Sequence, residues 1–557
     1  MYRCPNCSAG MRYDIYKRSL KCDYCGYICA AENHPQQQEE AARDDYEVTL
    51  FSCPQCGGQI RSTDNAATDF CSYCGASVVL EGRLVNEKKP AYIIPFSRTK
   101  EECKEVFKKR AKKAWCLPNA YKDPKKLEKF TGIYIPYWVY DVSQHAEPTV
   151  QGVRRAGAYT EYCNMNLEIN LNYRWIYYDA ALGFSDDLSD MISDYSSKDI
   201  EKFCGAYLSG FYADSPDVKE ATYIEDAALV SCDSTIATAK KKYTDVYFEK
   251  VIDPLSTFNV QVEDARMALF PVWFCTWRNK GRVSYAVVNG QTLKAAADLP
   301  VSFPKFLFYS LLFAVPFAVL FLFLPSITPQ VTLWVYLLVG MWTILQNYST
   351  AMAYVRRESH LTDKGRLLST ESGWKLWKKG HDKKMEKMAE EKRRAEWKKS
   401  AEEAERKRKT ETGEEEESSG CGSCLLVFVL PVFISGFLSL ALLQVFSNTP
   451  DNLPTIFVEE VTPFIAIILS IAIPIIIIKG TTPKRLLLTI LPDTLFLSAA
   501  VAAASCVMMT RPVKDLYYYI AALAVFAGIL VGYLAIFHRF NLSCTRPIPN
   551  YHERGDR

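Results

Sequence analysis

The pattern of hydrophobic and polar residues changes at about residue 300. Before this point short apolar stretches alternate with polar ones, and after it long apolar stretches follow one another. A segment needs roughly 20 mainly apolar residues to cross a hydrocarbon layer ~30 Å thick. Six stretches are candidate spans: 306–324, 331–354, 425–446, 463–478, 486–509 and 516–537. The second part of the chain therefore predicts an α-helical, polytopic membrane region of about six spans.

The first part shows the two periodicities of an α+β domain over residues 90–300. Alternating residues predict strands at 134–142, 164–172, 244–249, 268–277 and 282–288. The last of them runs into Asn289-Gly290, which predicts a two-residue hairpin. Helical spacing predicts helices at 98–114, 197–208 and 218–242. We expect a mainly antiparallel domain whose core contains Pro136-Tyr137-Trp138 and Pro271-Val272-Trp273.

A charged run, 356–417, lies between the second and third candidate spans, with 19 Lys and Arg against 16 Asp and Glu. Positive residues next to spans mark the cytoplasmic side of a membrane. We therefore expect this run, residues 1–300 and the C-terminus to lie in the cytoplasm. Opposite charges three or four residues apart predict a long helix over 374–409. This helix either lies on anionic membrane lipid through a basic amphipathic face or is a solvated spacer.

Eight of the 19 cysteines fall into two blocks that match when one is shifted by 49 residues. Each block reads C-x2-C, fourteen residues, C-x2-C, and a glycine follows its last cysteine. The spacing is typical of zinc ribbons, in which two knuckles each supply a pair of thiolates to a tetrahedral shell. Disulfides or buried hydrophobic cysteines are the alternative, but two complete copies favour zinc. The ligands are expected to be Cys4, Cys7, Cys22 and Cys25, and Cys53, Cys56, Cys71 and Cys74.

Four thiolates close a coordination shell and leave no position for a water molecule, which favours structural over catalytic zinc. We expect two structural zinc ions in the chain. A ribbon of this length has little core of its own, so metal binding, worth ~10 to 16 kcal/mol in small zinc modules, is expected to drive its folding. The glutamine-rich stretch between the ribbons is expected to be a linker or a short helix.

The sequence offers no recognisable active site. It contains no phosphate-binding G-x4-G-K-[ST], no H-E-x-x-H and no G-x-S-x-G. The acidic cluster Asp186, Asp187, Asp190 and Asp194 is most simply a helix cap or a solvated loop. We expect neither enzymatic activity nor nucleotide binding. Polar residues within the candidate spans leave ion or substrate transport as an alternative: Gln346, Asn347 and Asp493.

Several segments resemble one bacterial family. They are 51–58, 94–96, 132–141, 208–211, and 270–273 through 288–292 to 298–300. In this order they are similar to the bacterial membrane-anchored zinc-ribbon proteins, often labelled TFIIB-type zinc-ribbon proteins or, misleadingly, primosomal replication helicase. The resemblance covers about residues 50 to 325. It implies a cytoplasmic ribbon on a membrane anchor, acting as an adaptor in envelope-stress systems beside PspA-like and SPFH-like proteins.

This chain departs from the simpler family pattern in its additional ribbon, its charged insertion and its further spans. The sequence predicts these parts in order: zinc ribbon 1 (1–30), linker (31–50), zinc ribbon 2 (51–82), α+β domain (90–300), transmembrane hairpin (304–355), charged helix (356–420), four-span region (425–538) and cytoplasmic tail (539–557). We expect a multi-pass protein of the cell membrane that recruits cytoplasmic proteins as an adaptor or scaffold.

Two other functions stay open. One is a nucleic-acid-binding or regulatory zinc-ribbon protein, which needs a basic face with exposed aromatic residues. The second ribbon disfavours it, because Arg61 is the one Lys or Arg between residues 53 and 74. The first ribbon keeps it open through Arg12, Lys17, Arg18 and Lys21. The other is a transporter-like protein with a regulatory cytoplasmic domain.

Overall fold

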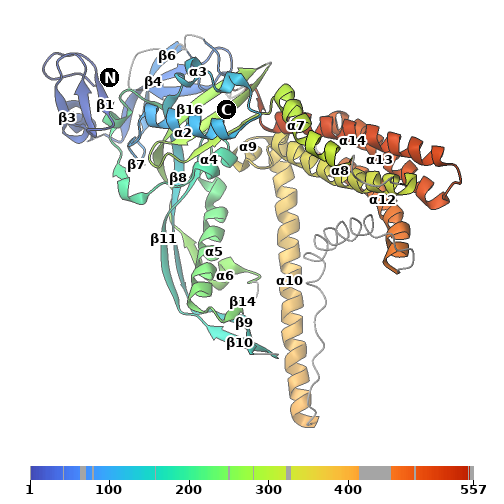
Figure 1. Cartoon of the computed structure of the whole chain (residues 1–557). Coiled ribbons are helices and arrows are strands. Elements are labelled where there is room, and N and C mark those ends of the chain that lie inside the picture. Colours follow the sequence, from blue (N-terminus) through green and yellow to red (C-terminus); the bar gives the residue numbers. More distant parts are fainter. Residues whose placement is uncertain are drawn as a thin grey trace. The chain divides into compact units, whose positions relative to one another are not determined.

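The computed structural model describes residues 2–41, 43–62, 70–77, 81–156, 159–248, 251–279, 281–321, 328–412, 453–481, 484–549 and 551. They fall into two compact units. The first comprises Met1–Leu324, Met352–Lys384 and Phe537–Arg557, and the second comprises Pro325–Ala351 and Met385–Ile536. The first unit contains the cysteine blocks and all of the described strands (Figure 1).

The first cysteine block forms a small antiparallel sheet, drawn in dark blue in Figure 1. Its order is β1 (Met11–Asp14), β2 (Ser19–Cys22) and β3 (Ile28–Ala30). The glutamine-rich stretch that follows contains a short helix, α1 (Pro35–Ala41). Gln37 of this helix is buried and accepts a hydrogen bond from the Tyr2 hydroxyl at 2.9 Å. The glutamines therefore fasten a helix to the ribbon.

A sheet of thirteen strands surrounds two long central strands, β8 (Thr131–Ala146) and β16 (Arg266–Asn279). Its main path is β12-β7-β16-β8-β13-β5-β4-β6, with β11, β15, β17, β18 and β19 paired beside it. The β13·β8 and β16·β7 pairs are parallel and the other described pairs are antiparallel. The prediction of a mixed α/β domain is thus confirmed. The remaining strands of this sheet are β4 (Asp45–Ser52), β5 (Gln59–Ser62), β6 (Glu81–Lys88), β7 (Tyr92–Ile93), β11 (Ile169–Asp179), β12 (Glu201–Lys202), β13 (Tyr212–Asp214), β15 (Val260–Val262), β17 (Arg282–Asn289), β18 (Ala295–Ala297) and β19 (Arg546–Pro547).

The alternation along β8 and β16 builds two hydrophobic cores, one on each face of the sheet. Tyr134, Trp273 and Trp277 point into one core, which α2 (Lys100–Lys113) covers with Phe107 and Ala111. Intervening residues such as Ile135 and Val272 point into the other, which α4 (Asp186–Ile192) covers. Because both faces are buried, these strands are almost continuously apolar. The expected burial of the two tryptophan-bearing segments is confirmed for Tyr137 and Trp273.

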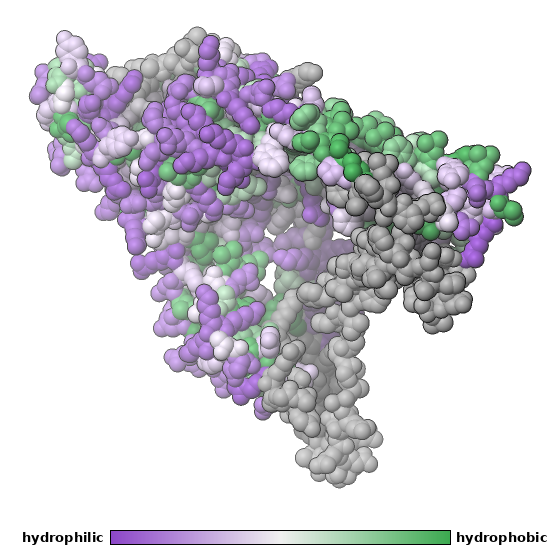
Figure 2. Space-filling view, viewed as in Figure 1, coloured by the Kyte–Doolittle hydropathy of each residue, from purple (hydrophilic) through white to green (hydrophobic). Residues whose placement is uncertain are grey.

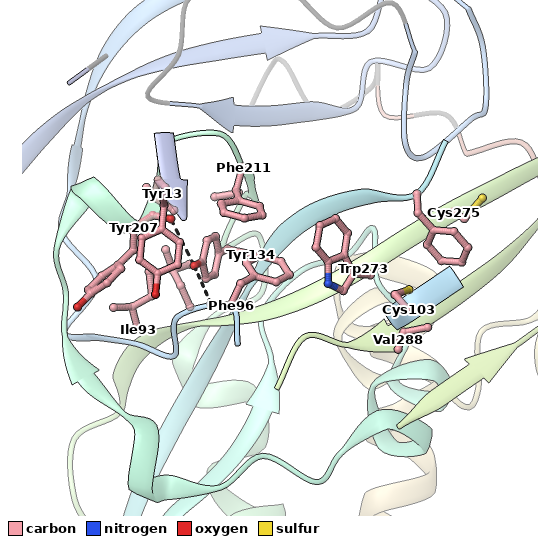
Figure 3. Packing of buried hydrophobic residues seen from close by; sticks show 14 of the residues in the cluster. Tyr13, Ile93, Phe96, Cys103, Tyr134, Tyr207, Phe211, Trp273, Cys275 and Val288 are labelled. Carbon is pink, nitrogen blue, oxygen red and sulfur yellow. Dashed lines mark hydrogen bonds between the residues drawn. The ribbon is translucent and has the colours of Figure 1, made fainter. Parts of the chain in front are cut away.

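Four of the segments that carry the family resemblance, 94–96, 132–141, 208–211 and 270–273, meet in one aromatic cluster (Figure 3). Phe96 stacks on Phe211 with ring centroids 4.3 Å apart, and Tyr134 and Trp273 lie at 5.0 and 5.1 Å from the same ring. The Trp273 indole N–H donates to the Arg98 carbonyl at 2.9 Å. These motifs, distant in sequence, are therefore parts of one core that joins β8, β16 and the loops at their ends.

Strand β17, which runs into Asn289-Gly290, does not end in the predicted two-residue hairpin. The backbone N–H of Asn289 donates to the Lys294 carbonyl, and its side-chain oxygen accepts from the N–H groups of Gln291 and Thr292, which makes a longer loop before β18. Gly290 is required for close packing, since a Cβ there would lie 2.7 Å from Phe96 Cδ1. The prediction was wrong because a tertiary contact, rather than turn conformation, selects this glycine.

Helices were predicted well where the apolar spacing was regular. Residues 98–114 contain α2, whose Thr99 and Glu102 form a capping box. Residues 218–242 contain α5 (Ile224–Lys242). The helix expected at 197–208 was wrong: short 3-10 turns occur there, because Glu201 and Lys202 pair with β7 as β12.

Two of the predicted strands also need adjustment. The expected strand 164–172 is divided between β10 (Tyr159–Asn166) and β11. The expected strand 244–249 contains β14 (Val246–Phe248), which pairs with β9 (Thr149–Ala156) in a third sheet of order β10-β9-β14.

The described residues contain three helical segments long and apolar enough to cross a membrane: Thr462–Gly480, Lys484–Thr510 and Asp515–Ser543. They belong to α12 (Leu453–Gly480), α13 (Leu487–Thr510) with the short turn before it, and α14 (Asp515–Ser543). Their exposed surface is rich in large apolar side chains, and Figure 2 shows such hydrophobic surface over the helices. They indicate a membrane protein.

Within the residues that the structure describes, about three spans are supported rather than the six expected. The first expected span lies in α7 (Phe303–Phe321), where the apolar helix found among the described residues, Phe303–Pro316, is shorter than a span. The second lies in α8 (Pro329–Glu358), where a polar stretch at 346–350 lowers the hydropathy of an otherwise apolar helix. The third, 425–446, lies outside the described residues.

Within the charged run, the long helix predicted for 374–409 is confirmed as α10 (Glu371–Thr412). Its apolar residues are concentrated near its start, where Trp377 stacks on His381 at 4.7 Å. The His381 Nε2 atom lies 3.3 Å from a carboxylate oxygen of Glu225 on α5. The beginning of the helix is thus fastened to the first unit.

Candidate metal centres

Four cysteine pairs adopt the same knuckle. In each, the N–H of the first cysteine donates to the carbonyl five residues later, and its carbonyl accepts from the N–H four residues later, all at 2.8 to 3.0 Å. The residue at that fourth position has a positive φ: Ser8 at 60°, Gly26 at 74°, Gly57 at 70° and Gly75 at 68°. Three of the four are glycine because this conformation is strained for other residues. The glycine after the last cysteine was correctly interpreted as part of a knuckle.

The eight predicted ligands form two sets of four. The sulfur atoms of each set lie within 4.8 Å of one another. The closest pairs are Cys4–Cys25 and Cys7–Cys22 at 3.5 Å, and Cys53–Cys74 and Cys56–Cys71 at 3.8 Å. Tetrahedral zinc with Zn–S bonds of about 2.3 Å requires sulfurs about 3.8 Å apart. Both sets therefore fit a zinc ion, and a disulfide is excluded in each because its S–S bond is only about 2 Å long.

The thiols of each set also affect one another's ionisation. The backbone N–H of Cys25 lowers the pKa of Cys22 to about 7. Hydrogen bonding with Cys56 lowers the pKa of Cys74 and raises the pKa of Cys71. One thiol in each set thus loses its proton readily, whereas its neighbours resist a second negative charge. A divalent cation at the centre would neutralise the thiolates and remove that resistance.

The second ribbon is built into the large sheet. Its strand β5 pairs with β13, and β4 pairs with both β5 and β6. The hydroxyl of Thr276 on β16 donates to the Ser72 carbonyl, and that of Tyr285 on β17 donates to the Tyr73 carbonyl at 2.8 Å. All four of its cysteines are buried. Hydrogen bonds from the sheet thereby fix the knuckle that contains Cys71 and Cys74.

The C-terminal segment completes the cover of the second ribbon, a role that the sequence did not reveal. Strand β19 pairs with β17, and the N–H of Tyr551 donates to the Cys56 carbonyl at 2.6 Å. The Tyr551 ring packs edge-on against Tyr73 with centroids 6.0 Å apart. The sequence signal was a single tyrosine in a tail rich in Arg, Pro and Asn, and no local pattern indicated that this tyrosine is buried.

The first ribbon contacts the domain through its sheet. The N–H of Tyr13 donates to the Ser209 carbonyl at 3.0 Å, and its ring lies 5.2 Å from Tyr207, at the edge of the aromatic cluster. Arg18 pairs with Asp199 at 3.5 Å. Its cysteine knuckles are more open than those of the second ribbon, since Cys25 is exposed and Cys7 half-buried.

One member of the acidic cluster, Asp186 in the first turn of α4, makes a half-buried contact, whereas Asp190 and Asp194 are exposed as a solvated segment would be. Asp186 accepts hydrogen bonds from the Lys364 N–H at 2.9 Å and from the Tyr223 hydroxyl at 3.1 Å. Burial, with the charge of Asp363 nearby, raises the pKa of Asp186 to about 7. Burial likewise raises the pKa of Asp363 to about 6. The sequence could not show this, because its partner segment is about 175 residues away in the chain.

Asn347 and Asp493, two of the three polar residues expected inside the spans, contact each other in the second unit. The side-chain amide of Asn347, on α8, donates to the Asp493 carboxylate at 3.1 Å and to the Thr494 hydroxyl at 3.4 Å. Asn347 and Thr494 are fully buried. Gln346 precedes Asn347 on the same helix and is half-buried. This contact joins α8 to α13.

The described fold and its sulfur sets define a class: an apparent membrane protein with two tetracysteine clusters consistent with zinc ribbons. No protein-family model matches the chain, and no solved structure matches it. Among curated proteins, the chain is similar to "Uncharacterized protein YdjG" of Bacillus subtilis (strain 168). The two are 28% identical over 316 residues, which cover 54% of this chain and 90% of that protein. The name of that relative states no function.

Proposed function

We propose that the chain is a membrane-anchored adaptor whose zinc ribbons present a rigid docking surface to partner proteins. The observation that carries the proposal is the pair of four-sulfur sets with zinc geometry. Four sulfurs fill a tetrahedral zinc shell, so each ion would hold its ribbon in shape and bind no substrate. A fixed surface that needs little ordering on binding is an efficient docking element.

The connection between the ribbons and the apolar helices supports this proposal. Arg282, on β17, pairs with Glu358 at 2.6 Å, and Arg357 pairs with the largely buried Asp298 at 2.7 Å. The Asn541 side chain, at the end of α14, exchanges hydrogen bonds with the backbone of Val301 at 2.7 and 3.0 Å. The sheet is therefore tied to the ends of two apolar helices, and a protein docked on a ribbon would be held near the membrane.

The orientation and the partners belong to the same proposal. The Lys- and Arg-rich α10 follows α8 after one short helix, Lys364–Leu368, and favours the cytoplasmic side for the first unit. In that compartment the thiolates stay reduced. The resemblance to membrane-anchored zinc-ribbon proteins suggests PspA-like or SPFH-like partners in envelope stress, and the basic stretches of α10 suit anionic lipid.

Transport is the second candidate, and one observation favours it. Asn347, Asp493 and Thr494 form a buried polar contact between apolar helices, and such groups often mark a substrate or ion path. The replacement Asp493→Asn keeps the size of the side chain and removes its charge. Transport would be supported by a proton or cation flux into vesicles containing the purified chain that this variant abolishes. Flux equal to that of empty vesicles would refute it.

The adaptor proposal is tested by affinity purification of the full chain from crosslinked bacterial membranes. Wild type is compared with one variant in which Cys4, Cys7, Cys22 and Cys25 are serine, another in which Cys53, Cys56, Cys71 and Cys74 are serine, and the control Cys116→Ser. We expect a defined membrane-associated protein to co-purify with wild type and the control, and to be lost from a ribbon variant that still inserts into the membrane. Recovery that is equal in all four samples would contradict the proposal.

A further inference from the structure

The two ribbons are copies of one motif, and only one of them is described with its outer face covered. A shift of 49 residues aligns Cys7 with Cys56, Ala9 with Gly58, and Tyr24 with Tyr73. Tyr73 is 3% exposed, whereas Tyr24 is 85% exposed. The same side chain on the same knuckle is thus a buried contact in the second ribbon and a solvent-exposed ring in the first.

The cover of the second ribbon shows what such a knuckle binds. Strand β19 pairs with β17 of the domain, and the N–H of Tyr551, a few residues further on, donates to the Cys56 carbonyl. The tyrosine ring of that stretch meets the Tyr73 ring edge-on. Tyr551 thus supplies both a backbone donor to a cysteine carbonyl and an aromatic ring to the knuckle tyrosine.

The space around two pairs of equivalent positions differs between the covered second ribbon and the open first ribbon. A Cβ at Gly75 would lie 3.3 Å from atoms of Arg278 and Thr276, whereas at the equivalent Gly26 it would meet nothing within 4 Å. At Gly58 a Cβ would lie 2.8 Å from the Tyr73 ring, and the first ribbon carries alanine at the equivalent position 9. The covered ribbon therefore needs small residues where β16 and the Tyr73 ring pack on it, whereas a Cβ at Gly26 of the first ribbon has free space.

Charge separates the two faces further. Residues 1–30 hold five Lys and Arg against two Asp and Glu, a net charge of +3 (5 − 2), and one of the five, Arg18, is paired with Asp199 of the domain. Residues 51–77 hold one Arg against two Asp, a net charge of −1 (1 − 2). The open ribbon therefore suits an acidic segment, unlike the tail that covers the second ribbon with Arg546 at its start.

We propose that the exposed knuckle of the first ribbon binds an extended, acidic, tyrosine-bearing segment of a partner protein, whose N–H would donate to the Cys7 carbonyl while its tyrosine packs on Tyr24. The inference rests on the adaptor function proposed above and names the part of the surface that docks. The C-terminal tail of this chain already occupies the second ribbon. The ligand of the first ribbon is accordingly assigned to another protein.

The test uses the purified full chain in detergent and a fluorescein-labelled probe peptide, Glu-Pro-Ile-Pro-Asn-Tyr-Glu-Glu, read by fluorescence anisotropy. The probe keeps the residues of 547–551 and adds acidic flanks. Tyr24→Ala is expected to weaken its binding at least tenfold, because a central aromatic residue dominates contacts of this kind. The matched control is Tyr16→Ala, which removes an equally exposed tyrosine, 81% exposed, from the turn at the opposite end of the β1–β2 hairpin. Zinc content measured on both variants shows that the ribbon is still folded.

Binding that is equal in wild type and Tyr24→Ala would overturn the inference, as would equal binding of a probe with alanine in place of tyrosine. It would also be overturned if a labelled single-stranded oligonucleotide bound through Tyr16 and Tyr24 while the peptide did not, since the surface would then be a nucleic-acid site. A protein that co-purifies through the first ribbon and is still retained by Tyr24→Ala would leave the adaptor function standing and refute this docking site alone. If no protein co-purified with wild type or with any variant, the adaptor function itself would be refuted.

Discussion

Replacing Gly58 by alanine measures how tightly the second ribbon is enclosed. The added Cβ would lie 2.8 Å from Tyr73 Cδ2, 3.3 Å from Cys56 Sγ and 3.4 Å from Tyr551 Cδ2. Carbon atoms in good contact are about 3.5 to 4.0 Å apart. The Tyr73 ring is buried against Tyr551, so it cannot move away without disturbing the cover of the ribbon.

The expected magnitude follows from two opposing effects. Overpacking of a buried site costs about 1 to 3 kcal/mol. The smaller conformational freedom of alanine in the unfolded chain offsets about 0.4 to 1 kcal/mol of this. The net loss is about 1 to 2 kcal/mol, and because 1.4 kcal/mol corresponds to tenfold, zinc in the second ribbon should bind about 5- to 30-fold more weakly.

The assay is competition with a chromophoric zinc chelator on the purified full chain. Gly58→Ala is tested in a chain whose four first-ribbon cysteines are replaced by serine, so that the zinc signal comes from the second ribbon alone. Ala9→Gly, tested in the reciprocal background, is the matched control, because it makes the same exchange in reverse at an open knuckle and relieves no clash. Unchanged zinc affinity in Gly58→Ala, or an effect of Ala9→Gly as large, would refute the enclosure of the second ribbon.

Three further predictions concern the tail, the aromatic cluster and the acidic cluster. Tyr551→Ala removes the ring that covers Tyr73 and should speed zinc release to a chelator from the second ribbon but not from the first; equal acceleration at both would contradict this cover. Gly290→Ala places a Cβ 2.7 Å from Phe96 and 2.8 Å from Pro271, so we expect a loss of about 1 to 3 kcal/mol in the free energy of unfolding, seen as a lower thermal midpoint, whereas a shift below one degree would show that the cluster adapts. Burial raises the pKa of Asp186 to about 7, so the folded protein keeps the proton that the unfolded chain releases near pH 4, and stability contributed by this group is lost as the pH rises from about 4 through 7. From pH 8 to pH 5.5 wild type should therefore gain about 2 kcal/mol relative to Asp186→Asn, by thermal unfolding at each pH, and parallel pH profiles of the two proteins would refute the shift.

The metal ligands were predictable from the sequence because knuckle geometry depends on local spacing. C-x2-C with a following residue of positive φ fixes the backbone hydrogen bonds of each knuckle, and the 49-residue repeat identified both sets. Strands β8 and β16 were predictable for the same kind of reason, since their alternation is long and regular.

The features that escaped prediction depend on contacts between distant residues. The cover of Tyr73 by Tyr551 and the burial of Asp186 under Lys364 have no local signature. Gly290 resembles a turn residue but is selected by the ring of Phe96. Two expected spans are not supported by the described residues: the apolar helix Phe303–Pro316 is shorter than a span, and α8 includes a polar segment around Asn347 that contacts another helix.

The central claim is that each ribbon holds one structural metal ion, and metal content per chain tests it most directly. The full chain, extracted from membranes and purified without added metal, is measured by inductively coupled plasma mass spectrometry beside the two variants in which one ribbon's cysteines are serine. We expect about two zinc ions per wild-type chain and about one in each variant. Less than one zinc in wild type, or a zinc content that neither set of serines changes, would contradict the account.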